Sequence, residues 1–313
     1  MQREILFELS SPYRDDFRIR GYHFGKGTKA ACIIGATRGN EIQQVYIAGQ
    51  LVKRLKQLEQ ENKILPGKRI LVVPSLNPFS MNIGKRFWVQ DNTDINRMFP
   101  GYNLGETTQR IAAGAFEKIQ DYEIGIQFAS FYLSGDFIPH VRMMKTGMEN
   151  VEMAKDFSLP YVTVRQPRPF DTTTLNYNWQ IWNTHAFSVY ARDTEKIDLD
   201  AARITIESVL TFLGRQGILE YEPTLTDTST VVEEGELFNI KTPRAGLFQP
   251  LVTVGASVKK NQPMAQIIDP YEGEVIETLT SHQDGRVFFI QDKPFILEKT
   301  LAFKMIMESI SGT

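Results

Sequence analysis

The feature that most constrains the fold of this chain is a pair of short apolar runs separated by one long amphipathic stretch. Residues 30–35 read Ala-Ala-Cys-Ile-Ile-Gly, and residues 69–74 read Arg-Ile-Leu-Val-Val-Pro. Continuous apolar runs of this length are typical of strands that a parallel sheet buries on both faces. Between the two runs, residues 41–58 carry apolar side chains at helical spacing, at Ile42, Val45, Ala48, Leu51, Leu55 and Leu58. This strand–helix–strand order predicts an α/β fold.

The rest of the chain extends this pattern and then departs from it. Further helices are predicted over residues 107–119, 150–157 and 200–214, and further strands over residues 124–128, 161–165 and 186–190. After about residue 222, Thr, Val and Gly dominate, and residues 246–258 and 284–290 have the pattern of hairpins. We therefore expect an α/β domain in residues 1–222, with a mixed, mainly parallel sheet flanked by helices. Residues 223–313 are expected to form a small β-rich domain.

Composition excludes several classes of protein. The 313 residues are 42% apolar and 23% charged, with a net charge of −2. Because no basic surplus exists, nucleic acid is not an expected partner. No apolar run approaches the ~20 residues of a membrane span, and the N-terminal residues lack the apolar core of a secretory signal. The single cysteine, Cys32, lies in an apolar run and is expected to be a buried small hydrophobe. These features indicate a cytoplasmic protein that does not bind membranes.

Three short segments carry the residues with the most specific chemistry. Residues 77–103 lack periodicity and contain Asn-Pro at 77–78, Arg86 and the run Asp-Ile-Asn-Arg-Met-Phe-Pro-Gly at 94–101. Residues 35–41 read Gly-Ala-Thr-Arg-Gly-Asn-Glu, and residues 124–130 read Ile-Gly-Ile-Gln-Phe-Ala-Ser. Together they resemble the succinylglutamate desuccinylase/aspartoacylase family, a deacylase branch of the zinc carboxypeptidase-like fold. The resemblance implies a family reaction in which zinc hydrolyses the amide bond of N-acyl amino acids.

The same resemblance assigns a carboxylate-binding role to the long irregular segment. In the family, the residues that match Arg86, Asn96 and Arg97 bind the substrate carboxylate, and Asp94 belongs to the same motif. Guanidinium groups suit this role because their planar fork can donate two parallel hydrogen bonds to one carboxylate. A simpler alternative is that Asp94 and Arg97 pair at i,i+3 and merely fix the loop.

The resemblance also shows where the chain departs from the family pattern. Family members bind zinc through the His and Glu of Gly-x-x-His-Gly-Asn-Glu and through the His of an Asp-Leu-His motif. Here Arg38 and Gln127 stand at the two His positions, and Gly125 replaces the Asp. Glu41 is the only ligand retained. The family's catalytic Glu corresponds to Tyr190, so no catalytic residue can be assigned.

A cation at a metal position has a large energetic consequence. A guanidinium and a dication ~4 Å apart repel by roughly 8 kcal/mol at an effective dielectric constant near 20. Zinc is therefore expected to be absent or weakly bound. Arg38 and Glu41 could instead form an ion pair in the vacated position, or both could point to solvent. A relocated metal site built from His140, His185 and Glu41 is a further alternative, although no metal-type spacing supports it.

Two functions follow from these residues. The first is a degenerate, non-zinc pseudo-hydrolase that keeps the fold and binds a small anion, such as an N-acyl amino acid or a peptide carboxylate. The second is an active metal-dependent deacylase with an atypical metal site. A third possibility is a purely structural component of a homo-oligomer. Residues 254–267 resemble a biotinyl/lipoyl-type barrel, but the expected hairpin tip at 269–273 has no lysine. That module is therefore expected to be structural.

Overall fold

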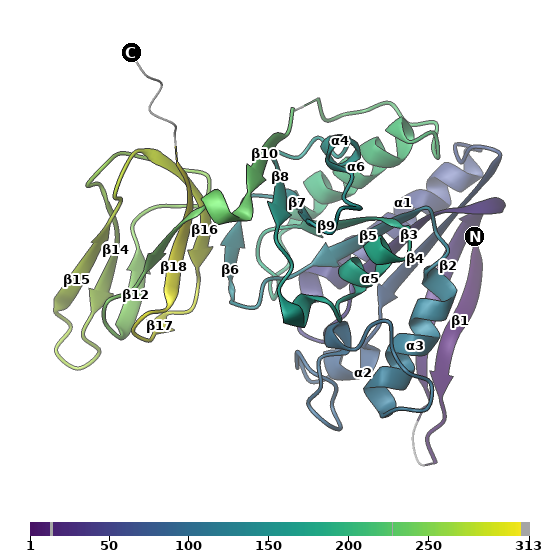
Figure 1. The fold of residues 1–313 in the computed structure, drawn as a ribbon, viewed down its shortest axis with the longest axis horizontal. Helices are drawn as coiled ribbons and strands as arrows, with labels where there is room; N and C mark the ends of the chain where they lie inside the picture. Colours follow the sequence, from purple (N-terminus) through teal and green to yellow (C-terminus); the bar gives the residue numbers. More distant parts are fainter. Residues whose placement is uncertain (13–14, 227, 308–313) are drawn as a thin grey trace. The chain divides into compact units, whose positions relative to one another are not determined.

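The computed structural model describes residues 1–12, 15–226 and 228–307 (Figure 1). The chain forms two compact units. The first comprises Met1–Ser130 and Pro139–Val231, and the second comprises Phe131–Ile138 and the chain from Val232 onward. Composition alone gave a boundary at residue 222. It gave no indication that residues 131–138 belong to the second unit, where one short strand completes a sheet.

The first unit is built on one nine-stranded sheet in the order β1-β2-β4-β3-β5-β9-β7-β8-β10. Its strands are β1 (Gln2–Leu9), β2 (Phe17–Gly25), β3 (Gly27–Ala36), β4 (Gly67–Ser75), β5 (Ile124–Ala129), β7 (His140–Met144), β8 (Tyr161–Arg165), β9 (His185–Tyr190) and β10 (Thr230–Glu233). Its helices are α1 (Ile42–Gln60), α2 (Pro78–Met81), η1 (Ile95–Arg97), α3 (Thr107–Ile119), α4 (Val151–Lys155), η2 (Pro169–Asp171), α5 (Leu175–Ile181) and α6 (Leu199–Arg215). The α/β fold expected from the sequence is confirmed. None of the helices in the described residues is long and apolar enough to cross a bilayer.

The direction of the central strands decides where a site can form. Strands β4, β3, β5 and β9 are mutually parallel neighbours, so their carboxyl ends meet at one edge of the sheet. Strand β7 pairs with β9 in the antiparallel sense, so β7 begins at that same edge. In open α/β sheets, ligands bind outside the carboxyl ends of the parallel strands.

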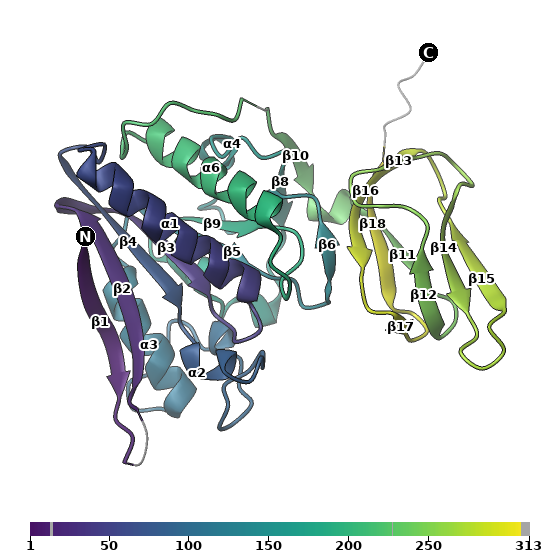
Figure 2. The same cartoon turned by 180° about the vertical axis from the view of Figure 1, so that it is seen from behind.

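Helices cover the two faces of this sheet with separate cores. Helices α1 and α6 lie on one face (Figure 2), where Leu51 and Leu55 share a core with Val209 and Phe212. Helices α3 and α5 lie on the other face (Figure 1), and their core includes Trp179. Apolar residues at helical spacing therefore position both layers.

Gly125 of β5 shows how closely α5 packs on its face of the sheet. A Cβ atom at Gly125 would lie 2.6 Å from the ring of Trp179. Side chains alternate along a strand, so Gln127, two residues further on, points to the same face as Gly125. The α5 face is therefore the face that carries Gln127.

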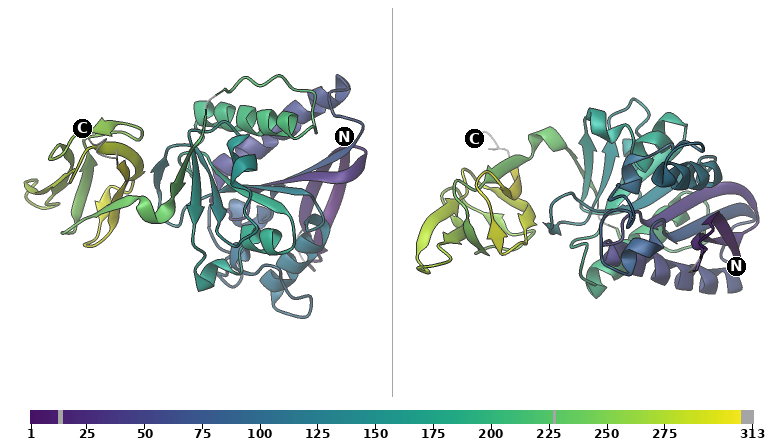
Figure 3. Two further views of the ribbon diagram at one scale, coloured as in Figure 1. Left: turned by 45° about the horizontal axis from the view of Figure 1, so that its top comes forward. Right: turned by 90° about the horizontal axis from the view of Figure 1, so that it is seen from below.

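The second unit consists of two antiparallel sheets (Figure 3). One has the order β11-β18-β16-β13 with β6 paired to β16, and the other has the order β15-β14-β12-β17. The elements are β6 (Gly135–Phe137), η3 (Glu234–Glu236), β11 (Phe238–Lys241), β12 (Gly246–Pro250), β13 (Ser257–Val258), β14 (Pro263–Ile268), β15 (Val275–Thr280), β16 (Gly285–Gln291), β17 (Phe295–Ile296) and β18 (Leu301–Met307). The tip between β14 and β15 carries the exposed Tyr271. A structural role for this unit stays a prediction.

The packing at Gly125 leads to a stability prediction. Gly125→Ala should destabilise the protein by about 1–3 kcal/mol, because the new methyl group must displace Trp179. Gly49→Ala is the matched control, since Gly49 is exposed in α1 with no atom within 4 Å of its ideal Cβ position. This control should stabilise by about 0.5–1 kcal/mol. Urea unfolding of both variants measures the difference, and equal midpoints would contradict the packing argument.

Candidate functional site

Arg38 lies at the carboxyl edge of the sheet, between the end of β3 and the start of α1. Its side chain is 4% exposed. Its Nη1 atom donates to Glu41 Oε1 at 3.0 Å, and its Nε atom donates to the two carboxylate oxygens of Asp94 at 3.0 and 3.1 Å. Nη2 lies 2.9 Å from Asp94 Oδ2. One buried guanidinium is therefore held between two carboxylates.

Glu41 is fully buried, and protein donors surround its carboxylate. Oε2 accepts from the backbone N–H groups of Thr37 and Arg38 at 2.7 and 3.0 Å, and from Thr37 Oγ1 at 3.2 Å. Oε1 accepts from Ser130 Oγ at 2.5 Å in addition to Arg38. The turn that joins β3 to α1 supplies most of these donors, and the residue after β5 supplies the last. Both oxygens therefore carry protein hydrogen bonds.

Charges at this centre shift the pKa values of its arginines. Burial opposes the charge of Arg38, but the carboxylates of Asp94 and Glu41 outweigh burial and raise the pKa of Arg38. Arg86 Nη2 lies 3.7 Å from Asp94 Oδ2. Burial, followed by repulsion from Arg38, lowers the pKa of Arg86 to about 10. Burial and Arg38 also lower the pKa of Arg97. Arg86 and Arg97 thus lie where a bound anion would stabilise their charge.

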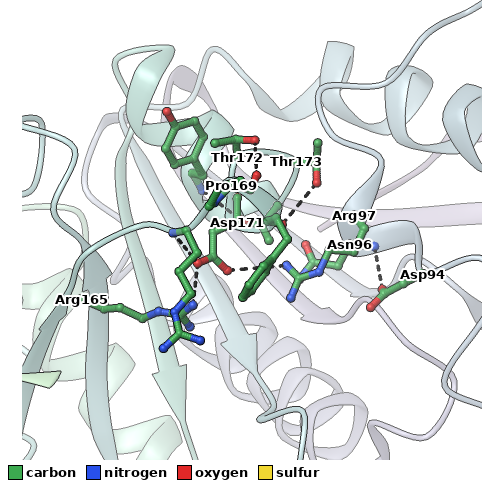
Figure 4. A network of polar contacts seen from close by, with 12 residues as sticks. Asp94, Asn96, Arg97, Arg165, Pro169, Asp171, Thr172 and Thr173 are labelled. Atoms are coloured by element: carbon green, nitrogen blue, oxygen red, sulfur yellow. Dashed lines mark hydrogen bonds and ion pairs between the residues drawn. The ribbon is translucent and has the colours of Figure 1, made fainter. Parts of the chain in front are cut away.

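The loop alternative for Asp94 and Arg97 is wrong, because each residue pairs elsewhere. Asp94 binds Arg38. Arg97 Nη1 instead lies 3.9 Å from Asp171 Oδ1 (Figure 4). Asp171 is also bound by Arg165 Nη2 at 2.5 Å. The guanidinium of Arg97 lies 5.4 Å from the ring centroid of Phe170 and remains 31% exposed. The guanidinium group of Arg97 therefore remains accessible to solvent.

Asn96 connects this loop to α5. Its backbone N–H donates to Asp94 Oδ1 at 3.0 Å, and its Oδ1 accepts from the backbone N–H of Leu175 at 3.1 Å. Neither Asp171 nor Ser130 was assigned a role from the sequence. Asp171 lies 74 positions after Arg97, in a turn without any motif, so no local signal pairs them.

Gln127 and Tyr190 both lie on the α5 face of the sheet. Gln127 is 3% exposed and aligns with Ser188 of β9. Tyr190 stacks on His140 with ring centroids 4.7 Å apart and planes 6° apart. The guanidinium carbon of Arg142 lies 4.5 Å from the Tyr190 ring centroid. Sequence reasoning gave no role to Arg142.

The relocated metal site is not assembled. His140 aligns with Tyr190 at the end of β9, whereas His185 begins that strand opposite Ile124 of β5. Five residues of strand separate the two positions, or ~16 Å. In the part of the chain that the structure describes, no group of three His, Cys, Asp or Glu side chains could hold a metal ion.

Comparison with known proteins places this architecture in a family. Residues 27–214 match the model of the succinylglutamate desuccinylase/aspartoacylase catalytic domain. The match spans more than half of the chain, so the chain belongs to the succinylglutamate desuccinylase/aspartoacylase family. No curated protein sequence matches the chain.

Solved structures of similar fold cover nearly the whole chain. A succinylglutamate desuccinylase from a Silicibacter species is 18% identical, with a TM-score of 0.81 over 97% of this chain and 94% of its own. The product-bound ectoine utilization protein EutE from Ruegeria pomeroyi is 17% identical, with a TM-score of 0.81 over 98% and 95%. A succinylglutamate desuccinylase/aspartoacylase from Rhodobacter sphaeroides is 19% identical, with a TM-score of 0.76 over 94% and 90%. At these identities the likeness establishes the fold alone.

Removing the central cation should have a large effect on stability. Arg38→Met leaves Glu41 buried without a cation and leaves Asp94 with only the more distant Arg86, so we expect a loss of about 3–5 kcal/mol in the free energy of unfolding. Arg18→Met is the control, because Arg18 pairs with Glu8 and Asp16 in partly exposed positions. That change should shift the unfolding midpoint very little. Denaturant unfolding measures both, and comparable losses would contradict the central role of Arg38.

Proposed function

We propose that this protein is a carboxylate-binding member of its family in which Arg38 takes the place of zinc, so that it does not hydrolyse amides through a metal. The observation that carries the proposal is the guanidinium of Arg38, which bonds both Glu41 and Asp94. Glu41 is the one retained family ligand, and its oxygens already accept bonds from Thr37, Arg38 and Ser130. A metal ion at Glu41 would have to displace these donors.

Charge and ligand chemistry support the same proposal. The Nη1 atom of Arg38 lies 3.0 Å from Glu41 Oε1, so a dication bound there would lie beside a permanent positive charge. Repulsion at ~4 Å amounts to roughly 8 kcal/mol at an effective dielectric constant near 20. Gln127 offers a neutral amide where the family has an imidazole, which is a weaker ligand for zinc. These residues therefore fit an ion pair better than a zinc centre.

The proposed ligand is a small anion such as an N-acyl amino acid or a peptide carboxylate. Arg86 and Arg97 are the candidate carboxylate-binding forks, with Asn96 fixing the loop between Asp94 and α5. The lowered pKa values of Arg86 and Arg97 favour an anionic partner, because a carboxylate offsets both the desolvation and the repulsion from Arg38.

Metal analysis tests the proposed absence of a zinc centre. Protein purified without added zinc should contain far less than one equivalent of metal by mass spectrometry. The variant Arg38→His/Gln127→His restores the family ligand set and should gain zinc, whereas Gln127→His alone should not. Stoichiometric zinc in the wild-type protein that is lost on Glu41→Ala would instead favour a working metal-dependent deacylase.

A ligand screen tests the anion site. N-acyl amino acids that raise the melting temperature of the wild-type protein should lose this effect in Arg97→Ala. Arg110→Ala removes an equal charge from an exposed position of α3 and should leave the effect intact. Stabilising ligands that act equally on both variants would show that Arg97 does not bind them.

The affinity for such a ligand should also depend on pH. The pKa of Arg86 in the folded protein is about 10, well below its ordinary value. The charged form binds the anion, so affinity should be constant near neutral pH and fall as pH rises through 10. Isothermal titration at pH 7.5, 9 and 10.5 measures this decline, with circular dichroism verifying the fold. Arg86→Gln should bind more weakly and show a smaller decline; an identical pH profile would contradict the assignment.

A further inference from the structure

A row of apolar side chains crosses one sheet of the second unit from edge to edge. This sheet has the strand order β15-β14-β12-β17 (Figure 1). Leu247 of β12 aligns with Phe295 of β17 on one side and with Ile268 of β14 on the other. Ile268 in turn aligns with Val275 of β15. Aligned residues on neighbouring strands point to the same face of a sheet, and we call these four residues the apolar row.

The apolar row lies on the outer face of the sheet. Side chains alternate along a strand, so the residues that adjoin Leu247, Ile268 and Phe295 point to the opposite face. Those neighbours are buried in the core of the second unit: Phe248, Ile267 and Ile296. Leu247, Val275 and Phe295 are instead 39%, 49% and 52% exposed, and Ile268 is partly exposed. The sheet therefore has a filled inner face and an uncovered apolar outer face.

The apolar surface extends beyond the row toward the turn between β14 and β15. Leu297, two positions after Phe295, is 64% exposed, and Tyr271 in the turn is 95% exposed. Together with the row, these side chains expose roughly 600 Å², which approaches the about 800 Å² that one partner contributes to a standard interface. Single exposed apolar residues are ordinary, but a contiguous patch of this size marks an interaction surface.

The two edges of this sheet carry opposite charges. On the β15 side, residues 269–280 contain four carboxylates and no lysine or arginine: Asp269, Glu272, Glu274 and Glu277. The β17 side comprises residues 292–299 and the turn 241–244, because the backbone N–H of Lys299 donates to the carbonyl of Thr242 at 2.7 Å. This side has two carboxylates, Asp292 and Glu298, and four cations: Lys241, Arg244, Lys293 and Lys299. The sheet thus has an acidic edge and a basic edge.

We propose that a second copy of this chain covers the apolar row, face to face, in a symmetric dimer. Sheets that pack in this way lie about 10 Å apart with their strands nearly aligned. A two-fold axis along the strands places β15 of each copy opposite β17 of the other, so each acidic edge meets a basic edge. An axis across the strands would instead bring like charges together. The charge distribution therefore favours a second copy as the occupant and selects its orientation.

Sedimentation velocity of the full chain, at concentrations up to about 100 µM, tests the dimer. The wild-type protein should dimerise, and Leu247→Glu should raise the dissociation constant at least about tenfold, because it buries a charge near the axis. Leu104→Glu makes the same change at an exposed leucine of the first unit and should behave as wild type. A monomeric wild-type protein would overturn the proposal and leave the row to a different partner. A dimer that Leu247→Glu does not weaken would also overturn it.

Cross-linking tests the orientation and does not require a disruptive variant. Val275 of one copy should lie opposite Phe295 of the other, whereas three strand spacings, or ~14 Å, separate them within one chain. A mixture of Val275→Cys and Phe295→Cys should give covalent dimers with bismaleimidoethane, and each variant alone should give far fewer. Wild-type protein is the control for Cys32, which is buried. Equal yields from Val275→Cys alone and from the mixture would contradict the proposed dimer.

Charge reversal at one edge tests the role of the charges. Lys293→Glu/Lys299→Glu turns the basic edge acidic, so that like charges oppose across the interface. The dissociation constant of the dimer should rise at least about tenfold at low salt. Lys53→Glu/Lys56→Glu makes the same change on the exposed side of α1 and should leave the dimer intact. Equal dissociation constants for the two variants would overturn the charge-selected arrangement, and circular dichroism verifies that each variant is folded.

Discussion

The buried guanidinium of Arg38 is the interaction on which the candidate site depends. It joins the end of β3, the first residues before α1 and the loop at 94–97, and Ser130 adds the end of β5. Four chain segments thus meet around one fixed charge. A buried ion pair is poor evidence for stability in itself, but removing one partner is costly because the other remains buried and charged. The geometry of Arg86 and Arg97 therefore follows from Arg38, which also repels both of them.

Local sequence pattern predicted the regular elements well and the long-range arrangement poorly. Residues 41–58 and 107–119 correspond closely to α1 and α3, because their apolar spacing and the chain breaks around them are local signals. The excursion of residues 131–138 into the second unit was not predictable, since β6 is a strand of three residues that exists only by pairing with β16. A strand this short leaves no periodicity to read.

The same distinction applies to the site. The pairing of Arg38 with Glu41, three residues away, was one of two alternatives that the sequence left open, and the structure contains it. The second partner, Asp94, is 56 residues away, so its contact could not be read from spacing. Asp94 was instead expected to contact ligand or Arg97. Strand register gives a still clearer case, because it alone brings Gln127, Ser188 and Arg142 together from distant segments.

Under the proposed function, Arg38 and Gln127 at the metal positions that the family resemblance assigns would form a coupled set rather than independent losses. A histidine at position 38 alone would leave Asp94 without its guanidinium and would still face an amide at Gln127, so it would lose the ion pair without gaining a complete ligand set. Restoring a histidine at position 127 alone would add an imidazole beside a permanent cation. Under this proposal, each single reversion is expected to be worse than either complete arrangement, because the residues belong to one electrostatic network. Under the proposed function, this coupling accounts for a glutamate at position 41: its carboxylate neutralises Arg38, and the hydrogen bonds from Thr37, Arg38 and Ser130 hold it in place.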